Sequence, residues 1–261
     1  MLGKLFKHEM KAMARLLLPL LLVLAALTAI DRIVLYLDIF TGTLKIIPFF
    51  ITFAYGCSVA AVLVITVILS VFRFYKNLIA EEGYLMFTLP VKSHQLITSK
   101  LIASALWTFI GYIAAICSVL VVLSGYYSIP EIMDMLATVI SEITAAFQSA
   151  GTLFAIELLA LIILGTLNNI LVIYVSIAIG QLFNGHKILG AVGAYIGINI
   201  VLQTVLSVGV LIIGVLYGDS FDQIDSITHI LLPYAILAII ILDAAYYTAT
   251  DYIFKRKLNL E

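Results

Sequence analysis

Residues 152–181 read TLFAIELLALIILGTLNNILVIYVSIAIGQ, a run in which Glu157 is the one charged side chain. A helix needs about 20 predominantly apolar residues to cross a hydrocarbon core of about 30 Å. Transmembrane β-strands are only about ten residues long and alternate in polarity, which this run does not. Because backbone polar groups in lipid must be satisfied within the segment itself, the run predicts a membrane-spanning α-helix.

Comparable apolar runs recur along the 261 residues, of which 64% are hydrophobic and 11% charged, with a mean hydropathy of +1.19. Soluble domains have about 45–50% apolar and about 25% charged residues, so this chain cannot cover a water-facing surface with charge. We predict an all-α polytopic membrane protein that forms a single transmembrane domain over residues 1–261. The six predicted spans are residues 16–37, 46–74, 100–124, 152–181, 188–217 and 229–252.

The first predicted span has a shorter apolar centre than the others, because Asp31 and Arg32 stand near its end. Basic residues precede it, as they precede the apolar part of a secretory signal peptide. The small residues around positions 27–29 do not have the spacing that cleavage of a signal peptide requires. We therefore interpret this run as a retained span.

The distribution of Lys and Arg predicts the orientation of the spans. Twelve of the 14 basic residues fall on one side when successive connections alternate across the membrane, and two fall on the other. Cytoplasmic connections carry the excess of Lys and Arg. Both termini and the connection between spans two and three are therefore expected in the cytoplasm.

The connection between spans three and four, expected outside, contains a predicted amphipathic helix. Ser128, Pro130 and Glu131 form the N-cap, first-turn proline and capping-box glutamate of a helix start. The apolar positions that follow have helical spacing: Ile129, Ile132, Met133, Leu136, Val139, Ile140, Ile143 and Phe147. We expect this helix at the outer membrane surface, packed over the ends of the spans, with substrate gating as the alternative.

Polar side chains within the spans are the first candidates for function, because charges at mid-depth cost about 2.5–3.5 kcal/mol or more. The candidates are Glu157, Asn168, Asn199, Gln203 and Asp243. Two carboxylates at different depths are more typical of interhelical hydrogen bonds than of ion coupling. Gly193 and Gly197 have the spacing of a close-packing motif, either within the subunit or at a subunit interface.

Several kinds of enzymatic site are excluded because the sequence lacks the motifs that they require. A P-loop requires G-x-x-x-x-G-K-[ST], and the single Gly-Lys pair, Gly3-Lys4, is followed by leucine. HExxH is absent, and the four histidines lie near span ends on both sides of the membrane, so no metal site is predicted. We expect no enzymatic activity and no cofactor bound by this chain.

The longest cytoplasmic connection, residues 73–100, mixes charged residues with the apolar side chains of Tyr84, Leu85 and Phe87. Apolar anchors surrounded by charge are typical of protein–protein docking surfaces. Gly83 can break a helix, Pro90 can turn the chain, and Ser93 can cap the next helix. A solvated elbow whose aromatic residues lie at the lipid interface is the alternative.

Three cytoplasmic segments resemble small type-2 ATP-binding-cassette transporter permeases of Gram-positive bacteria. They are residues 81–100, which include EEGYLMFTLP at 81–90 and QLITSK at 95–100, the N-terminal LFKHE at 5–9 with Arg15, and the C-terminal KRKLNLE at 255–261. Outside these segments the resemblance rests on the number and length of the spans.

The resemblance implies a permease subunit of an exporter in the bacterial cytoplasmic membrane, paired with a second permease subunit. A separate ATPase, which would bind ATP and Mg²⁺, would dock on the connection between spans two and three, and no nucleic acid is implied. The expected docking residues are Glu81, Glu82, Gly83, Tyr84, Leu85, Phe87, Pro90 and Lys92. The alternative is a motor-free ion-coupled carrier or membrane sensor that uses Glu157 or Asp243.

Overall fold

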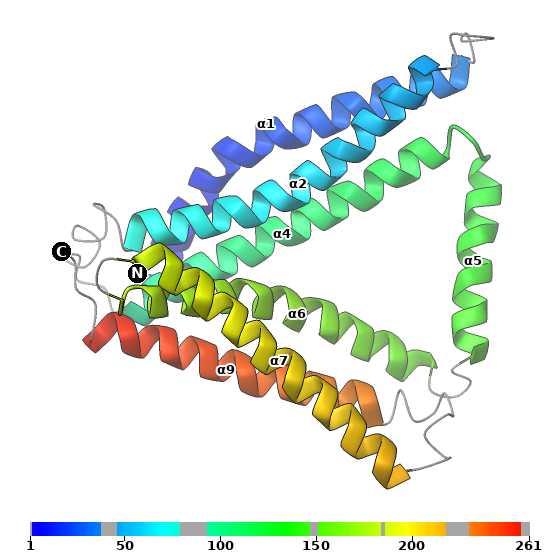
Figure 1. Ribbon diagram of the computed structural model, residues 1–261. Helices are drawn as coiled ribbons and strands as arrows, with labels where there is room; N and C mark the ends of the chain where they lie inside the picture. The colour runs from blue at the N-terminus through cyan, green and yellow to red at the C-terminus, as the bar shows by residue number, and fades with distance from the viewer. Residues whose placement is uncertain are drawn as a thin grey trace. The chain divides into compact units, whose positions relative to one another are not determined.

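The computed structural model describes residues 2–37, 46–78, 93–146, 151–183, 186–217 and 230–256. This part of the chain contains seven α-helices and no β-strand (Figure 1). The helices are α1 (Leu2–Leu37), α2 (Ile46–Leu78), α4 (Ser93–Leu123), α5 (Ile129–Ala146), α6 (Gly151–Gly180), α7 (Lys187–Tyr217) and α9 (Leu232–Arg256). Six of them, all but α5, are long and apolar enough to cross a membrane. The predicted all-α class is confirmed for these residues, and the six long apolar helices match the predicted number of spans.

Two helices begin earlier than the apolar segments that predicted them. Helix α1 starts at Leu2, whereas the predicted span starts at residue 16, and α4 starts at Ser93, whereas the predicted span starts at residue 100. Lys and Arg are good helix formers, so a basic segment can continue a helix that hydropathy alone would end. The spans are therefore the apolar parts of longer helices.

The exposed surfaces of these helices are apolar, as expected for lipid contact. Leu22 is 70% exposed, Leu211 is 66% exposed, and the apolar part of α7 has no buried residue. A water-soluble protein rarely exposes contiguous apolar patches of this extent. The six helices indicate a multi-pass membrane protein.

The chain divides into two compact units, and the divisions fall within helices. Unit 1 comprises residues 1–70 and 102–139, and unit 2 comprises residues 71–101 and 140–261. The prediction of a single transmembrane domain stays a prediction.

The core of unit 1 is formed by α1, α2 and α4. Its buried side chains fall into two clusters, Met13, Leu17, Ala103 and Trp107 in one and Leu24, Tyr55, Val62 and Val122 in the other. Each cluster joins residues that are far apart in the sequence, so the three helices pack along their lengths.

The core of unit 2 is formed around α6, which packs against both α7 and α9 (Figure 1). Leu171, Val172 and Val175 of α6 form a buried cluster with Tyr246 of α9. Nearer the start of α9, the Tyr234 ring occupies the space that a Cβ would take at Gly209 of α7.

Helix α5 begins with the hydrogen bonds that the sequence predicts for its N-terminus. The Ser128 backbone N–H donates to Glu131 Oε2 at 2.8 Å, and the Glu131 N–H donates to Ser128 Oγ at 3.5 Å. These reciprocal bonds satisfy two donors that a helix start would otherwise leave unpaired. The position of α5 relative to the membrane stays a prediction.

Candidate functional site

The predicted docking residues, Glu81 to Lys92, lie outside the described residues. The helical segments on either side of them are described, and we call these segments the stems. The first stem is the end of α2, residues 71–78, and the second is the beginning of α4, residues 93–101. Both stems belong to unit 2, which also contains α6, α7 and α9. The stems are therefore the part of the predicted docking region whose contacts can be described.

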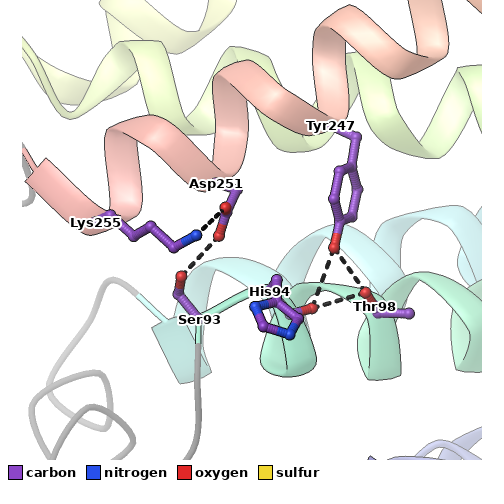
Figure 2. A network of polar contacts seen from close by, with 6 residues as sticks. All are labelled: Ser93, His94, Thr98, Tyr247, Asp251 and Lys255. Carbon is purple, nitrogen blue, oxygen red and sulfur yellow. Dashed lines mark hydrogen bonds and ion pairs between the residues drawn. The ribbon is translucent and has the colours of Figure 1, made fainter.

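The first residue of the second stem is bound to α9. Ser93 Oγ donates a hydrogen bond of 2.7 Å to Asp251 Oδ1, as Figure 2 shows. The other carboxylate oxygen, Oδ2, accepts a hydrogen bond of 2.5 Å from Lys255 Nζ, one turn further along α9. Asp251 therefore uses both oxygens, one to hold α4 and one within its own helix.

A second connection to α9 follows just over one turn later along α4. Thr98 Oγ1 and the Tyr247 hydroxyl are 2.8 Å apart, and the same hydroxyl donates to the His94 carbonyl oxygen at 3.3 Å (Figure 2). Thr98 Oγ1 also donates to the His94 carbonyl oxygen at 2.7 Å. Tyr247 and Asp251 are one helical turn apart on α9, so they contact the same face of α4.

The first stem is held by aromatic packing. Phe74 is completely buried, and its ring stacks on Tyr174 of α6 with the centroids 3.7 Å apart and the planes at 12°. Phe254 of α9 packs edge-on against the same ring, at 5.7 Å and 78°. Aromatic pairs of this kind contribute about 0.5–1.5 kcal/mol beyond the burial of their area.

Both stems thus contact α9, the second through hydrogen bonds and the first through Phe254. A displacement of the residues between them would be transmitted to α9 through side chains that are already in contact. We define the site by these contacts and call it the stem–α9 junction: Phe74, Ser93, His94, Thr98, Tyr174, Tyr247, Asp251 and Phe254. Its side chains suit mechanical coupling between helices, since their bonds hold the stems in place.

Two of the predicted intramembrane polar residues are brought together. Asn168 Nδ2 of α6 donates to Asp243 Oδ1 of α9 at 2.8 Å. Asn199 donates to the carbonyl oxygen of Tyr195 in its own helix, and Gln203 is exposed on α7. Glu157 is half-buried on α6. Asp243 therefore has a partner on another helix, as expected for an interhelical hydrogen bond.

Unit 1 contains a group of polar contacts that was not predicted from the sequence. Asp31 of α1 is completely buried and accepts a hydrogen bond of 2.7 Å from Thr52 of α2. Its neighbour Arg32 donates from Nε to Ser124 Oγ at 3.2 Å and lies over the Tyr36 ring. The sequence does contain a signal for this polar group, because an acidic and a basic residue occur together near the end of an apolar run.

A further hydrogen bond joins α2 to α4 in the same unit. The Tyr55 hydroxyl and Ser118 Oγ are 3.0 Å apart, and both residues are buried. Hydroxyl residues within a span carry little sequence signal, because they can also bond to their own helix. Ser118 does so, donating to the Ala115 carbonyl oxygen at 2.8 Å.

Among the residues that the structure describes, no three His, Cys, Asp or Glu side chains are grouped so that they could hold a metal ion. No protein family, curated protein or solved structure matches the chain.

Proposed function

We propose that this chain is the permease subunit of an ATP-binding-cassette exporter, powered by a separate ATPase that docks on residues 81–92. The observation that carries the proposal is the stem–α9 junction. The stems on either side of the proposed docking residues both contact α9. A docked ATPase that moved this connection would therefore act on a membrane helix through packed side chains.

The junction combines buried aromatic packing with hydrogen bonds, and both restrict movement of the stems relative to α9. Phe74 is completely buried between Tyr174 and Phe254, so the first stem cannot tilt without breaking a packed core. Two separate hydrogen-bonded contacts fix the second stem against α9.

The absence of a P-loop from the whole sequence supports a separate motor. ATP binding and hydrolysis on the partner would shift the permease between conformations, because each nucleotide state favours one arrangement of the docked subunits. A second permease subunit would complete the pathway. Both termini and residues 79–92 would face the cytoplasm of a bacterial cell, in accordance with the distribution of basic residues.

Helix α5 is proposed to lie on the outer surface of the membrane. Its apolar residues are largely exposed, with Ile129 at 71%, Met133 at 60% and Ile140 at 60%. Lipid headgroups and the acyl boundary would cover these side chains, as they cover other amphipathic helices.

The docking test compares two sets of substitutions in affinity-tagged chains that are expressed in the native host. Gly83, Tyr84 and Phe87 are replaced together by serine, and the co-purified ATPase is identified by mass spectrometry and measured as vanadate-sensitive ATP hydrolysis. The control replaces Tyr126 and Tyr127 by serine, because these residues are 59% and 42% exposed in the turn between α4 and α5. We expect the ATPase to be lost from the first variant and retained by the control. Retention by both variants would overturn the docking role.

A second candidate function, a motor-free ion-coupled carrier, is favoured by one observation. Asp243 Oδ2 is buried and has no hydrogen-bond partner among the described residues, which leaves it available to a proton or cation. This function predicts that activity persists in membranes stripped of every ATPase and is lost in Asp243→Asn. The exporter hypothesis predicts the opposite outcome in both experiments. Transport is lost from the stripped membranes and persists in Asp243→Asn, because it requires ATP hydrolysis by the partner.

A further inference from the structure

A groove of about 350 Å³ opens on unit 2 where α6 ends and α7 begins. Its apolar wall includes Ile173 and Ile177 of α6 and Ile188, Ala191 and Val192 of α7. Small-molecule sites in proteins ordinarily enclose about 300–1,000 Å³, so the groove is large enough to hold part of a ligand. Its walls contain few polar groups, and these are not evenly distributed.

Among the described residues that line the groove, Lys187 is the one with a charged side chain, and it lies at one end. Lys187, the first residue of α7, and Gln181, just after α6, lie at the turn between the two helices. From Lys187 to Tyr195 the groove extends over nine residues of α7, which are about 12 Å apart end to end at the rise of an α-helix. This length is less than half of a hydrocarbon core of about 30 Å, so the groove stays within one leaflet.

The shape of the groove is fixed by close packing at its charged end. A Cβ added to Gly180 would meet the Lys187 carbonyl oxygen and the Ala191 side chain at 2.6–2.7 Å. The Phe183 ring fills the corresponding space at Gly190. These contacts hold the start of α7 against the end of α6, so the groove is a property of the folded unit.

We propose that this groove binds an anionic phospholipid from the leaflet that contacts the α6–α7 turn. One acyl chain lies along the isoleucines, and the phosphate contacts the Lys187 ammonium. Charge complementarity selects the headgroup, because a basic residue near a membrane surface attracts anionic lipids and the apolar wall accepts hydrocarbon alone. The proposal does not depend on an ATPase, and the leaflet is the cytoplasmic one in the orientation proposed above.

The groove is tested by fluorescence quenching on the purified chain in mixed vesicles. Tyr195→Trp places a tryptophan on the groove wall, and the native Trp107 is 6% exposed and lies in unit 1, so the parent protein provides the background signal. Phosphatidylglycerol or phosphatidylcholine with brominated acyl chains is then titrated, because bromine quenches tryptophan on contact. We expect half-maximal quenching at a mole fraction about fivefold lower for phosphatidylglycerol, which corresponds to one basic contact.

Two pairs of further substitutions in the Tyr195→Trp protein distinguish binding of the lipid headgroup from binding of the acyl chain. Lys187→Gln should abolish the preference for phosphatidylglycerol, and Lys7→Gln, which removes an exposed lysine of α1, should preserve it. Ala191→Phe fills the groove and should weaken quenching by both lipids. Ile196→Phe adds bulk at a position of α7 that is 53% exposed and does not line the groove, and it should leave quenching unchanged.

Each of three results would overturn the proposal: equal quenching by the two lipids, a preference that survives Lys187→Gln, or quenching that Ala191→Phe does not change. A thermal unfolding measurement on every variant shows whether the fold is retained. If Ala191→Phe fails to fold, Val192→Phe at the same wall replaces it. Loss of ATPase binding in the docking experiment would not alter any of these results.

Discussion

Asn168 of α6 donates a hydrogen bond of 2.8 Å to Oδ1 of Asp243 on α9, and Oδ2 of the same carboxylate is buried without a hydrogen-bond partner among the described residues. A carboxyl group within a membrane-spanning helix is costly unless another group compensates it. The amide of Asn168 is thus the polar contact that holds Asp243 in place between the two helices.

We expect Asn168→Leu to destabilise the protein by about 1–2 kcal/mol, because it removes the hydrogen bond and leaves the Asp243 carboxyl group without its donor. The double variant Asn168→Leu with Asp243→Leu should recover part of this loss, since the unpaired polar group is then absent. Thermal unfolding in detergent micelles measures both. A double variant that is less stable by the sum of the two single effects would show that the residues do not interact.

Phe74→Ala should destabilise unit 2 by about 3–5 kcal/mol, because it leaves a cavity between Tyr174 and Phe254. The neighbouring residue Phe72 provides the control, since it is 57% exposed and its ring would contact lipid. Phe72→Ala should cost less than about 1 kcal/mol, because lipid replaces the lost contacts. Equal losses of unfolding free energy in the two variants would contradict the packing at the first stem.

Ser93→Ala should loosen the start of α4, because it removes the hydrogen bond to Asp251. Lys255→Gln should have little effect, since the Lys255–Asp251 pair is half exposed on the lysine side and such pairs contribute only about 0–1 kcal/mol. Hydrogen–deuterium exchange of a peptide covering residues 93–101 distinguishes the two variants. Faster exchange is expected in Ser93→Ala alone, and the same exchange in wild type and Ser93→Ala would exclude a role for this contact.

Thr52→Val should destabilise unit 1 by about 1–3 kcal/mol, because the completely buried Asp31 loses the hydroxyl that donates to it. Thr204→Val makes the same chemical change on the exposed surface of α7, where the hydroxyl donates to its own helix at the Ile200 carbonyl oxygen. The unfolding temperature should fall in the first variant and stay within error of wild type in the second. A fall of the same size in both would indicate a general effect of valine.

The helical class and the number of long apolar helices were predictable, because both follow from the apolar composition of long segments. Long apolar runs can be recognised without knowing what they pack against, so the six spans follow from the sequence. The starts of α1 and α4 were not predictable from hydropathy, because Lys4 and Ser93 are compatible with helix but not with the membrane interior.

The contacts of the polar residues depend on which helices are neighbours, and one sequence does not contain that information. The sequence shows that Asp243 is an exception in an apolar run, but its partner Asn168 is 75 positions away. For the same reason the partner of Asp31 could not be foreseen, since Thr52 comes from the next helix. The predicted docking residues lie outside the described residues, so their role depends on the experiment above.

The packing of Tyr234 against Gly209 has an evolutionary consequence. The tyrosine ring takes the place of a side chain at position 209, and its hydroxyl donates to the Val205 carbonyl oxygen at 2.5 Å. A single change from Gly209 to alanine would force the ring to move and break that bond, whereas a smaller residue at 234 would make room for it. In homologous sequences we expect positions 209 and 234 to change together, with glycine opposite tyrosine and larger residues opposite smaller ones.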